Sequence, residues 1–172
     1  MSVATLAIAS LWDGAPCRED ERATVTVERV PDGSLLIHID APMHGDPPPA
    51  GEPGSTDKLW EHEVVELFVL GDGERYTEIE VGPHGHFLVL RFEGPRANGT
   101  SGHPLEVSMS RGAERWTATA RLDAGLVPAG ELRGNAYAIH GIGEGRRYLA
   151  WTPVPGPHPD FHRIAMFAPL GL

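Results

Sequence analysis

The sequence predicts an all-β protein, an antiparallel β-sandwich of two sheets, and three observations lead to this fold class. Apolar and polar residues alternate with a period of two in several segments, which is the pattern of strands with one buried face. The chain has 21 glycines and 16 prolines among 172 residues, as expected for short strands joined by turns. No segment has the period of a long helix. Two antiparallel sheets packed face to face would bury such strands.

The N-terminal third is expected to open the sandwich. The first ten residues form a strand, and a polar segment follows up to Glu21. Ala23–Val30 and Ser34–Asp40 form a hairpin around Pro31-Asp32-Gly33. Residues 41–57 form a surface loop, because their prolines lack the backbone donor that a sheet needs. We interpret this loop as a connector, with a lid over the next strand as the functional alternative.

The stretch Leu59–Phe92 has the densest β signal in the chain. Three strands are predicted, His62–Leu70, Tyr76–Val81 and Phe87–Phe92, with tight glycine-containing turns between them. Residues two apart share a face, so Val65, Leu67 and Val69 should face the core while the other face of that strand carries Glu66 and extends to Trp60. The meander is then expected to align one wall of Glu66, Tyr76, Glu78, Glu80 and Arg91, with Glu80 solvated.

The second half of the chain should complete both sheets. In the strand Arg115–Leu122, the alternate residues Trp116, Ala118, Ala120 and Leu122 are expected to face inward. The remaining predicted elements are a strand Leu105–Ser110, one helical turn within Asp123–Pro128, strands Asn135–Ile142 and Tyr148–Thr152, a stiff loop Pro153–Pro159, and a closing strand His162–Phe167.

Composition limits the classes of function. A length of 172 residues suggests one domain, residues 1–172, and 41% hydrophobic residues suffice for a core. The formal net charge of −10, with Lys58 as the only lysine, disfavours nucleic-acid and anionic-membrane partners. Cys17 is the only cysteine, which excludes an internal disulfide and a cysteine metal cluster. Without a basic leader or a long apolar run, we expect a cytoplasmic protein.

Several segments in a fixed order resemble a known group of proteins. They are LWEHEVVELFV followed by YTEIEVGPHG, then ERWTATARLDAGLVP, and finally AWTPVPGPHPDFHRIAMFAPL. Their Trp, Glu-(Leu/Val)-Phe, Tyr-x-Glu, Pro-x-Gly and Phe-His-Arg positions are similar to those of DOMON-like domains, which include the family 9 carbohydrate-binding modules. The resemblance covers about Leu59 to Leu170. It implies a jelly-roll or immunoglobulin-like sandwich that binds a sugar.

A sugar site needs flat apolar faces for the C–H side of a pyranose and fixed polar groups for its hydroxyls. Trp60 and Trp151 are expected to supply the faces, Glu66 and Glu78 to accept hydrogen bonds, and Arg91 to donate them. The resemblance matches Trp60 and Glu66 to ligand-contacting positions, and Trp151 more loosely. Where relatives often have acidic residues, this chain has Glu61-His62. We expect no cofactor, with calcium the one option left open.

Each site residue also has a structural alternative. Trp60 could fill the core rather than a cleft, and Trp116 is expected to be a core residue. A carboxylate within the apolar strand around Glu66 is costly when buried alone, so an ion pair with Arg91 or Arg121 is the alternative to a ligand role.

Two rival functions remain open beside a non-catalytic, sugar-binding domain. His84 and His86, with Glu93 nearby, could bind a metal in a cupin-like enzyme, although the spacing of Glu93 is unusual for that class. Some members of the wider DOMON group bind haem, which needs an axial pair of Met or His side chains. The residues available for such a pair are Met109, Met166 and His140.

Overall fold

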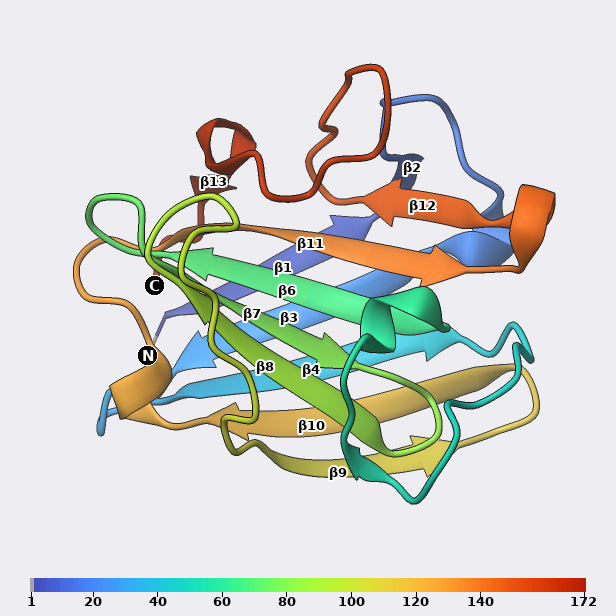
Figure 1. Ribbon diagram of the computed structural model, residues 1–172, viewed down its shortest axis with the longest axis horizontal. Coiled ribbons are helices and arrows are strands. Elements are labelled where there is room, and N and C mark those ends of the chain that lie inside the picture. The colour runs from blue at the N-terminus through green and yellow to red at the C-terminus, as the bar shows by residue number, and fades with distance from the viewer. Residues whose placement is uncertain (1) are drawn as a thin grey trace.

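Two β-sheets packed face to face make up the protein (Figure 1), in a computed structural model that describes residues 2–172. The smaller sheet has the strand order β1 (Val3–Ile8), β3 (Ala23–Arg29), β4 (Leu35–Pro42), β10 (Arg115–Leu122) and β9 (Glu106–Arg111). The larger sheet has the order β2 (Ser10–Leu11), β12 (Arg147–Ala150), β11 (Arg133–His140), β6 (Val64–Leu70), β7 (Tyr76–Val81), β8 (His86–Phe92) and β5 (Gly54–Ser55), and β13 (Ala168–Pro169) also pairs with β11. The predicted all-β, antiparallel sandwich is confirmed, apart from the parallel pair β5–β8.

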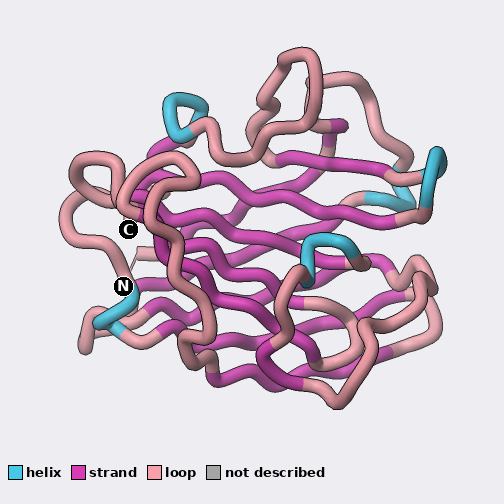
Figure 2. Tube along the Cα trace, viewed as in Figure 1, coloured by secondary structure: helices cyan, strands magenta, loops and turns pink. Residues whose placement is uncertain are grey.

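Helical structure is limited to single 3-10 turns at the ends of strands and in loops (Figure 2). None of these turns in residues 2–172 is long or apolar enough to cross a membrane. Their bounds are Glu19–Glu21 (η1), Leu59–Glu61 (η2), Ala124–Leu126 (η3), Gly143–Gly145 (η4) and Ile164–Met166 (η5).

The main core lies between the two sheets and follows the predicted period of two. Val65, Leu67 and Val69 of β6 face this core, as do Trp116 and the alternate alanines of β10. The ring of Trp116 is 1% exposed, so it is a core residue as expected. Removal of these apolar side chains from water contributes the main stabilisation of the sandwich.

The larger sheet is buried on its outer face as well, which is why all seven residues of β6 are buried. A second apolar cluster lies there and includes Phe68, Tyr76 and Tyr137 from the sheet with Phe161 and Phe167 from the C-terminal segment. In Figure 1 this face is toward the viewer, with η2 and the loop after β8 crossing in front of it. The segment after β12 therefore acts as a partial third layer beside the sheet.

Two predicted elements differ from the structure. Residues 41–57 include strand β5, which pairs with the edge strand β8 and leads into η2, so this segment extends the sheet and does not line the cleft described below.

His162–Phe167 is not a strand. It contains η5, and only β13 after it pairs with β11, because the proline-rich segment before it directs the chain across the sheet.

Candidate functional site

A cleft of about 560 Å³ opens on the outer face of the larger sheet. Strands β6, β7, β8, β11 and β12 provide its floor, and η2, the loop after β8 and the C-terminal segment provide its rim. Its volume is in the usual range for small-molecule sites. The residues that line it are Trp60, Glu66, Phe68, Glu78, Leu90, Phe92, Arg96, Gly99, Thr100, Ser101, Ile139, Tyr148, Pro159, Phe161 and His162.

Aromatic rings make the walls rigid. Phe161 stacks on Tyr137 with ring centroids 3.8 Å apart, and Phe92 stacks on Tyr76 at 4.8 Å. Phe68 contacts Tyr137 edge to face at 5.4 Å. Such pairs fix ring orientations as well as burying area. The apolar side of the cleft is therefore largely formed before any ligand enters.

Polar contacts hold the two rim loops together and to the sheet. Arg96 of the loop after β8 forms an ion pair with Asp160 of the C-terminal segment at 2.9 Å. The hydroxyl of Tyr76 lies 2.5 Å from Nδ1 of His162, and the backbone N–H of Arg96 donates to that hydroxyl oxygen at 3.1 Å. Asn135 donates to the Thr152 carbonyl at 2.7 Å and accepts from the Thr152 N–H, which anchors the start of the C-terminal segment.

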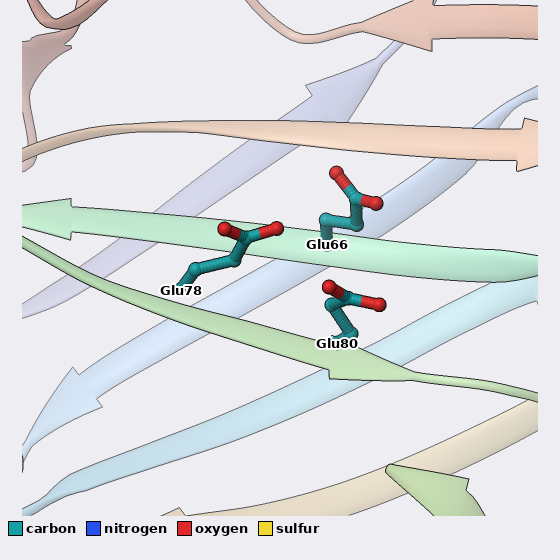
Figure 3. A group of neighbouring side chains, drawn as sticks. All are labelled: Glu66, Glu78 and Glu80. Carbon is teal, nitrogen blue, oxygen red and sulfur yellow. The ribbon is translucent and has the colours of Figure 1, made fainter. Parts of the chain in front are cut away.

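Three buried glutamates lie together at the cleft, where Glu66 and Glu78 line the floor and Glu80 is next to them but fully buried. Figure 3 shows Glu66 of β6 with Glu78 and Glu80 of β7 on one face of the sheet, their carboxylates gathered together. In residues 2–172 this is the one group of three or more His, Cys, Asp or Glu side chains whose ligand atoms all lie within 4.8 Å of one another. The three residues are 2%, 3% and 0% exposed, respectively. We call these residues the Glu triad.

Burial changes the protonation of the Glu triad. It raises the pKa of Glu78 to about 7, and together with the nearby carboxylates of Glu66 and Glu78 it raises that of Glu80 to about 11. Burial also raises the pKa of Glu66 well above its usual value, with the nearby Glu78 adding to the shift. Loss of solvation disfavours each charged form, and like charges disfavour it again.

His162 does not compensate for this charge at neutral pH. Its Nε2 lies 3.8 Å from Oε2 of Glu78, but burial and the Arg96 charge lower the pKa of His162 to about 4. The imidazole is therefore neutral at pH 7 and acts as a hydrogen-bonding partner of Tyr76.

The structure brings together three of the five predicted ligand-binding residues. Trp60, Glu66 and Glu78 all line the cleft, and Trp60 is 39% exposed, so it does not fill the core. Trp151 lies outside the cleft because its side chain packs against the core between the sheets. The predicted pairing of Trp60 with Trp151 is thus wrong, and Tyr148 is an aromatic residue that lines the cleft with Trp60.

Arg91 is on the opposite face of the sheet from Glu78. The turn after β7 closes with a hydrogen bond from the Gly82 N–H to the His86 carbonyl, which pairs Val81 with Phe87. This register sets Arg91 opposite Thr77 and Leu90 opposite Glu78. The predicted alignment of Arg91 with the Glu triad is therefore wrong, because a one-residue difference in register reverses the face.

The predicted ion pairs of Glu66 are absent from the described residues. Arg121 pairs instead with Asp32 at the surface, and Arg91 is exposed. Glu80, expected to be solvated, is fully buried. Glu80 shares a face of β7 with Glu78, as the alternation predicted. Its burial involves η2, which packs against β7 and which the alternation of the strand does not reveal.

The residues of the two rival sites do not converge. His84 contacts Arg111, His86 contacts the carbonyl of Gly51, and Glu93 pairs with Arg75, so these three do not form a metal site. Met109 packs with the core between the sheets and Met166 with the outer cluster, on opposite sides of the larger sheet. His140 is hydrogen-bonded to Glu21 at 3.0 Å.

Fold and cleft together define a two-sheet β-sandwich with a cleft of small-molecule size on the outer face of its larger sheet. The structure is similar to the crystal structure of a protein from Bacteroides uniformis ATCC 8492 that is proposed to bind carbohydrate. The similarity covers 98% of this chain and 84% of that chain, with a TM-score of 0.72 and 16% sequence identity. A family 9 carbohydrate-binding module from Caldicellulosiruptor kristjanssonii, solved with cellotriose, has a TM-score of 0.49 and 10% identity over 99% of this chain and 77% of its own. The similarity to the Bacteroides protein shows the fold.

The sequence itself places the chain in the UPF0462 family. It is 40% identical over 166 residues to the human UPF0462 protein C4orf33, covering 91% of this chain and 82% of the human one. The zebrafish homologue is 37% identical over 166 residues, covering 91% of this chain and 83% of its own. No protein-family model matches the chain.

Proposed function

We propose that this protein is a non-catalytic binding domain of DOMON-like type whose ligand is a carbohydrate held in the cleft over β6 and β7. The observation that carries the proposal is the placement of Trp60 and Glu66 in one cleft of about 560 Å³. An aromatic face and a fixed acceptor are the two elements that a pyranose requires. The fold shared with the Bacteroides protein supports this assignment.

Each part of the cleft has a role in this proposal. Trp60, which is 39% exposed at the rim, presents a ring for the C–H face of a sugar, and Tyr148 offers a second aromatic surface. Glu66 and Glu78 accept hydrogen bonds from hydroxyls at the floor. Arg96, held by Asp160, is a donor at the rim and takes the role that Arg91 cannot fill. We assign no catalytic residue.

We expect a thermal-shift screen of mono- and disaccharides to identify a ligand whose binding depends on the cleft. Trp60→Ala should lose stacking, and Glu66→Gln should lose an acceptor because it replaces one carboxyl oxygen with an N–H donor, each weakening the affinity by about 1–3 kcal/mol. Calorimetric titration with the best sugar measures both effects.

Trp151→Phe is the matched control, since this tryptophan lies outside the cleft. Its affinity should equal that of the wild type. Equal affinities in Trp60→Ala and Glu66→Gln as well would refute the cleft as the binding site, and the absence of binding to every sugar would refute the carbohydrate assignment.

A further inference from the structure

We propose that Glu66, Glu78 and Glu80 bind one divalent cation of the calcium type on the outer face of β6 and β7, directly beneath the floor of the cleft. This site does not depend on the identity of the organic ligand. Its geometry is already that of a ligand cluster, because one oxygen from each carboxylate lies within 4.8 Å of the others. β6 and β7 are adjacent antiparallel strands, and Glu66 is directly opposite Glu80, so the backbone register fixes the cluster.

Unpartnered oxygens provide a second, independent observation. Both carboxylate oxygens of Glu80 and Oε2 of Glu78 are buried without a hydrogen-bond donor, counted over residues 2–172. The backbone of Trp60 and the carboxyl of Glu78 lie near Glu80, but neither forms a hydrogen bond of normal geometry to its oxygens. Buried acceptors are nearly always partnered in native proteins, so an unpartnered carboxylate that is 0% exposed indicates a missing group. That group must supply positive charge or protons.

Nearby cations of the protein do not supply this charge. Arg96 forms its ion pair with Asp160, and Arg146 donates to the backbone carbonyls of Trp60, His62 and Gly141. Neither guanidinium forms an ion pair with the Glu triad within the part of the chain that is described. The buried Glu21 is the contrasting case, because it has a bidentate ion pair with Arg147 at 2.7 and 2.8 Å.

The ligand set selects the class of metal. Three carboxylates are hard oxygen ligands, which suit calcium, magnesium or manganese rather than zinc or copper. Calcium binds oxygens at about 2.3–2.6 Å, so two oxygens on opposite sides of one ion are up to about 5 Å apart. A spread of no more than 4.8 Å admits calcium without movement of the strands. Calcium is favoured over magnesium because magnesium usually keeps several waters and takes only one or two carboxylates.

The test is calorimetric titration of chelator-treated protein with CaCl2 and, separately, with MgCl2, in the absence of sugar. We expect one calcium ion per chain, weaker binding of magnesium, and a melting temperature raised by about 5–10 °C at a calcium concentration about 100 times Kd. Glu80→Gln keeps the volume and removes the charge, so it should weaken calcium binding at least about ten-fold. Glu78→Gln provides the same test if the first variant does not fold.

Glu106→Gln, a strand glutamate exposed on the opposite sheet, is the control and should bind calcium like the wild type. No heat and no shift in melting temperature with calcium would overturn the proposal and leave shared protons as the partners of the Glu triad. Unchanged calcium binding in both triad variants would also overturn it. Because these titrations contain no sugar, a failure to bind calcium leaves the carbohydrate assignment intact. Conversely, a failure to bind any sugar leaves the calcium site intact.

Discussion

Trp116→Ala is expected to lower the free energy of unfolding by about 3–5 kcal/mol. The side chain is 1% exposed and lies between the two sheets, where β10 pairs with β4 on one side and β9 on the other. Both neighbouring strands are fixed by their ladders, so the structure cannot collapse into the space that the indole leaves. Urea or thermal unfolding of the two proteins measures the difference.

Two other tryptophan substitutions act as controls for this result. Trp60→Ala removes an indole that is 39% exposed at the rim of the cleft, so it should cost much less stability. Trp116→Phe keeps most of the aromatic volume and removes an Nε1–H that has no acceptor in the described structure, so its cost should also be small. A small effect of Trp116→Ala, comparable to that of Trp60→Ala, would contradict the placement of Trp116 in the core.

The sequence was most informative about which face of a single strand each side chain occupies. Parity along β6 and β10 correctly predicted that Leu67 and Trp116 face the core and that Glu66 faces away from it. A strand has only two faces, so one burial preference fixes every side chain along it. The hairpin of β3 and β4 was predictable for the same reason, with its turn residues visible at Asp32-Gly33.

Relationships between strands were harder to predict, as Arg91 shows. Its face depends on the hydrogen bond that closes the turn at Gly82, and local alternation does not indicate where a turn closes. Trp151 shows a second limit. It directly follows β12, where the chain leaves the sheet, and its inward packing results from the backbone bond of its N–H to the Ala136 carbonyl.

The burial of Glu80 was not predictable from its own strand. On the pattern alone, a glutamate that alternates with apolar residues on an antiparallel strand is expected to face water. It is buried here, and η2, whose Trp60 backbone lies beside Glu80, packs against β7 on this face. The Glu triad therefore emerges only from the tertiary structure.

Metal-free protein is expected to lose stability as the pH rises from 7 to 9, by about 3 kcal/mol or more. Burial raises the pKa of Glu80 from 4.5 to about 11 and that of Glu78 to about 7. A carboxyl whose pKa is higher in the folded state stabilises the fold fully below the unfolded pKa, and this contribution is lost as the pH rises toward the folded pKa. In this window the unfolded chain has released both protons, while the folded chain retains that of Glu80 and loses that of Glu78 as the pH rises past about 7.

Below pH 7 the buried histidines change the stability with pH in the opposite direction to the Glu triad, so the expected effect is confined to the range above pH 7. Burial lowers the pKa of His44, His140 and His162 from 6.5, so their contribution is present above that pH and is lost on acidification. Glu21, whose pKa is lowered to about 2 chiefly by Arg147 against the effect of burial, loses its contribution only below pH 4.5. Above pH 7 the Glu triad should therefore dominate the slope.

Urea unfolding in the presence of a calcium chelator, repeated at several pH values from 7 to 9, measures this slope. Glu80→Gln should flatten it and should be more stable than the wild type at pH 9, because the amide is neutral without taking up a proton on folding. Glu106→Gln, which changes an exposed carboxylate, should keep the wild-type slope. Saturating calcium should also flatten the slope in the wild type, since a bound divalent ion replaces the protons of the Glu triad. A pH-independent stability in the chelated wild type would show that these three carboxylates are compensated by solvent and would contradict their burial.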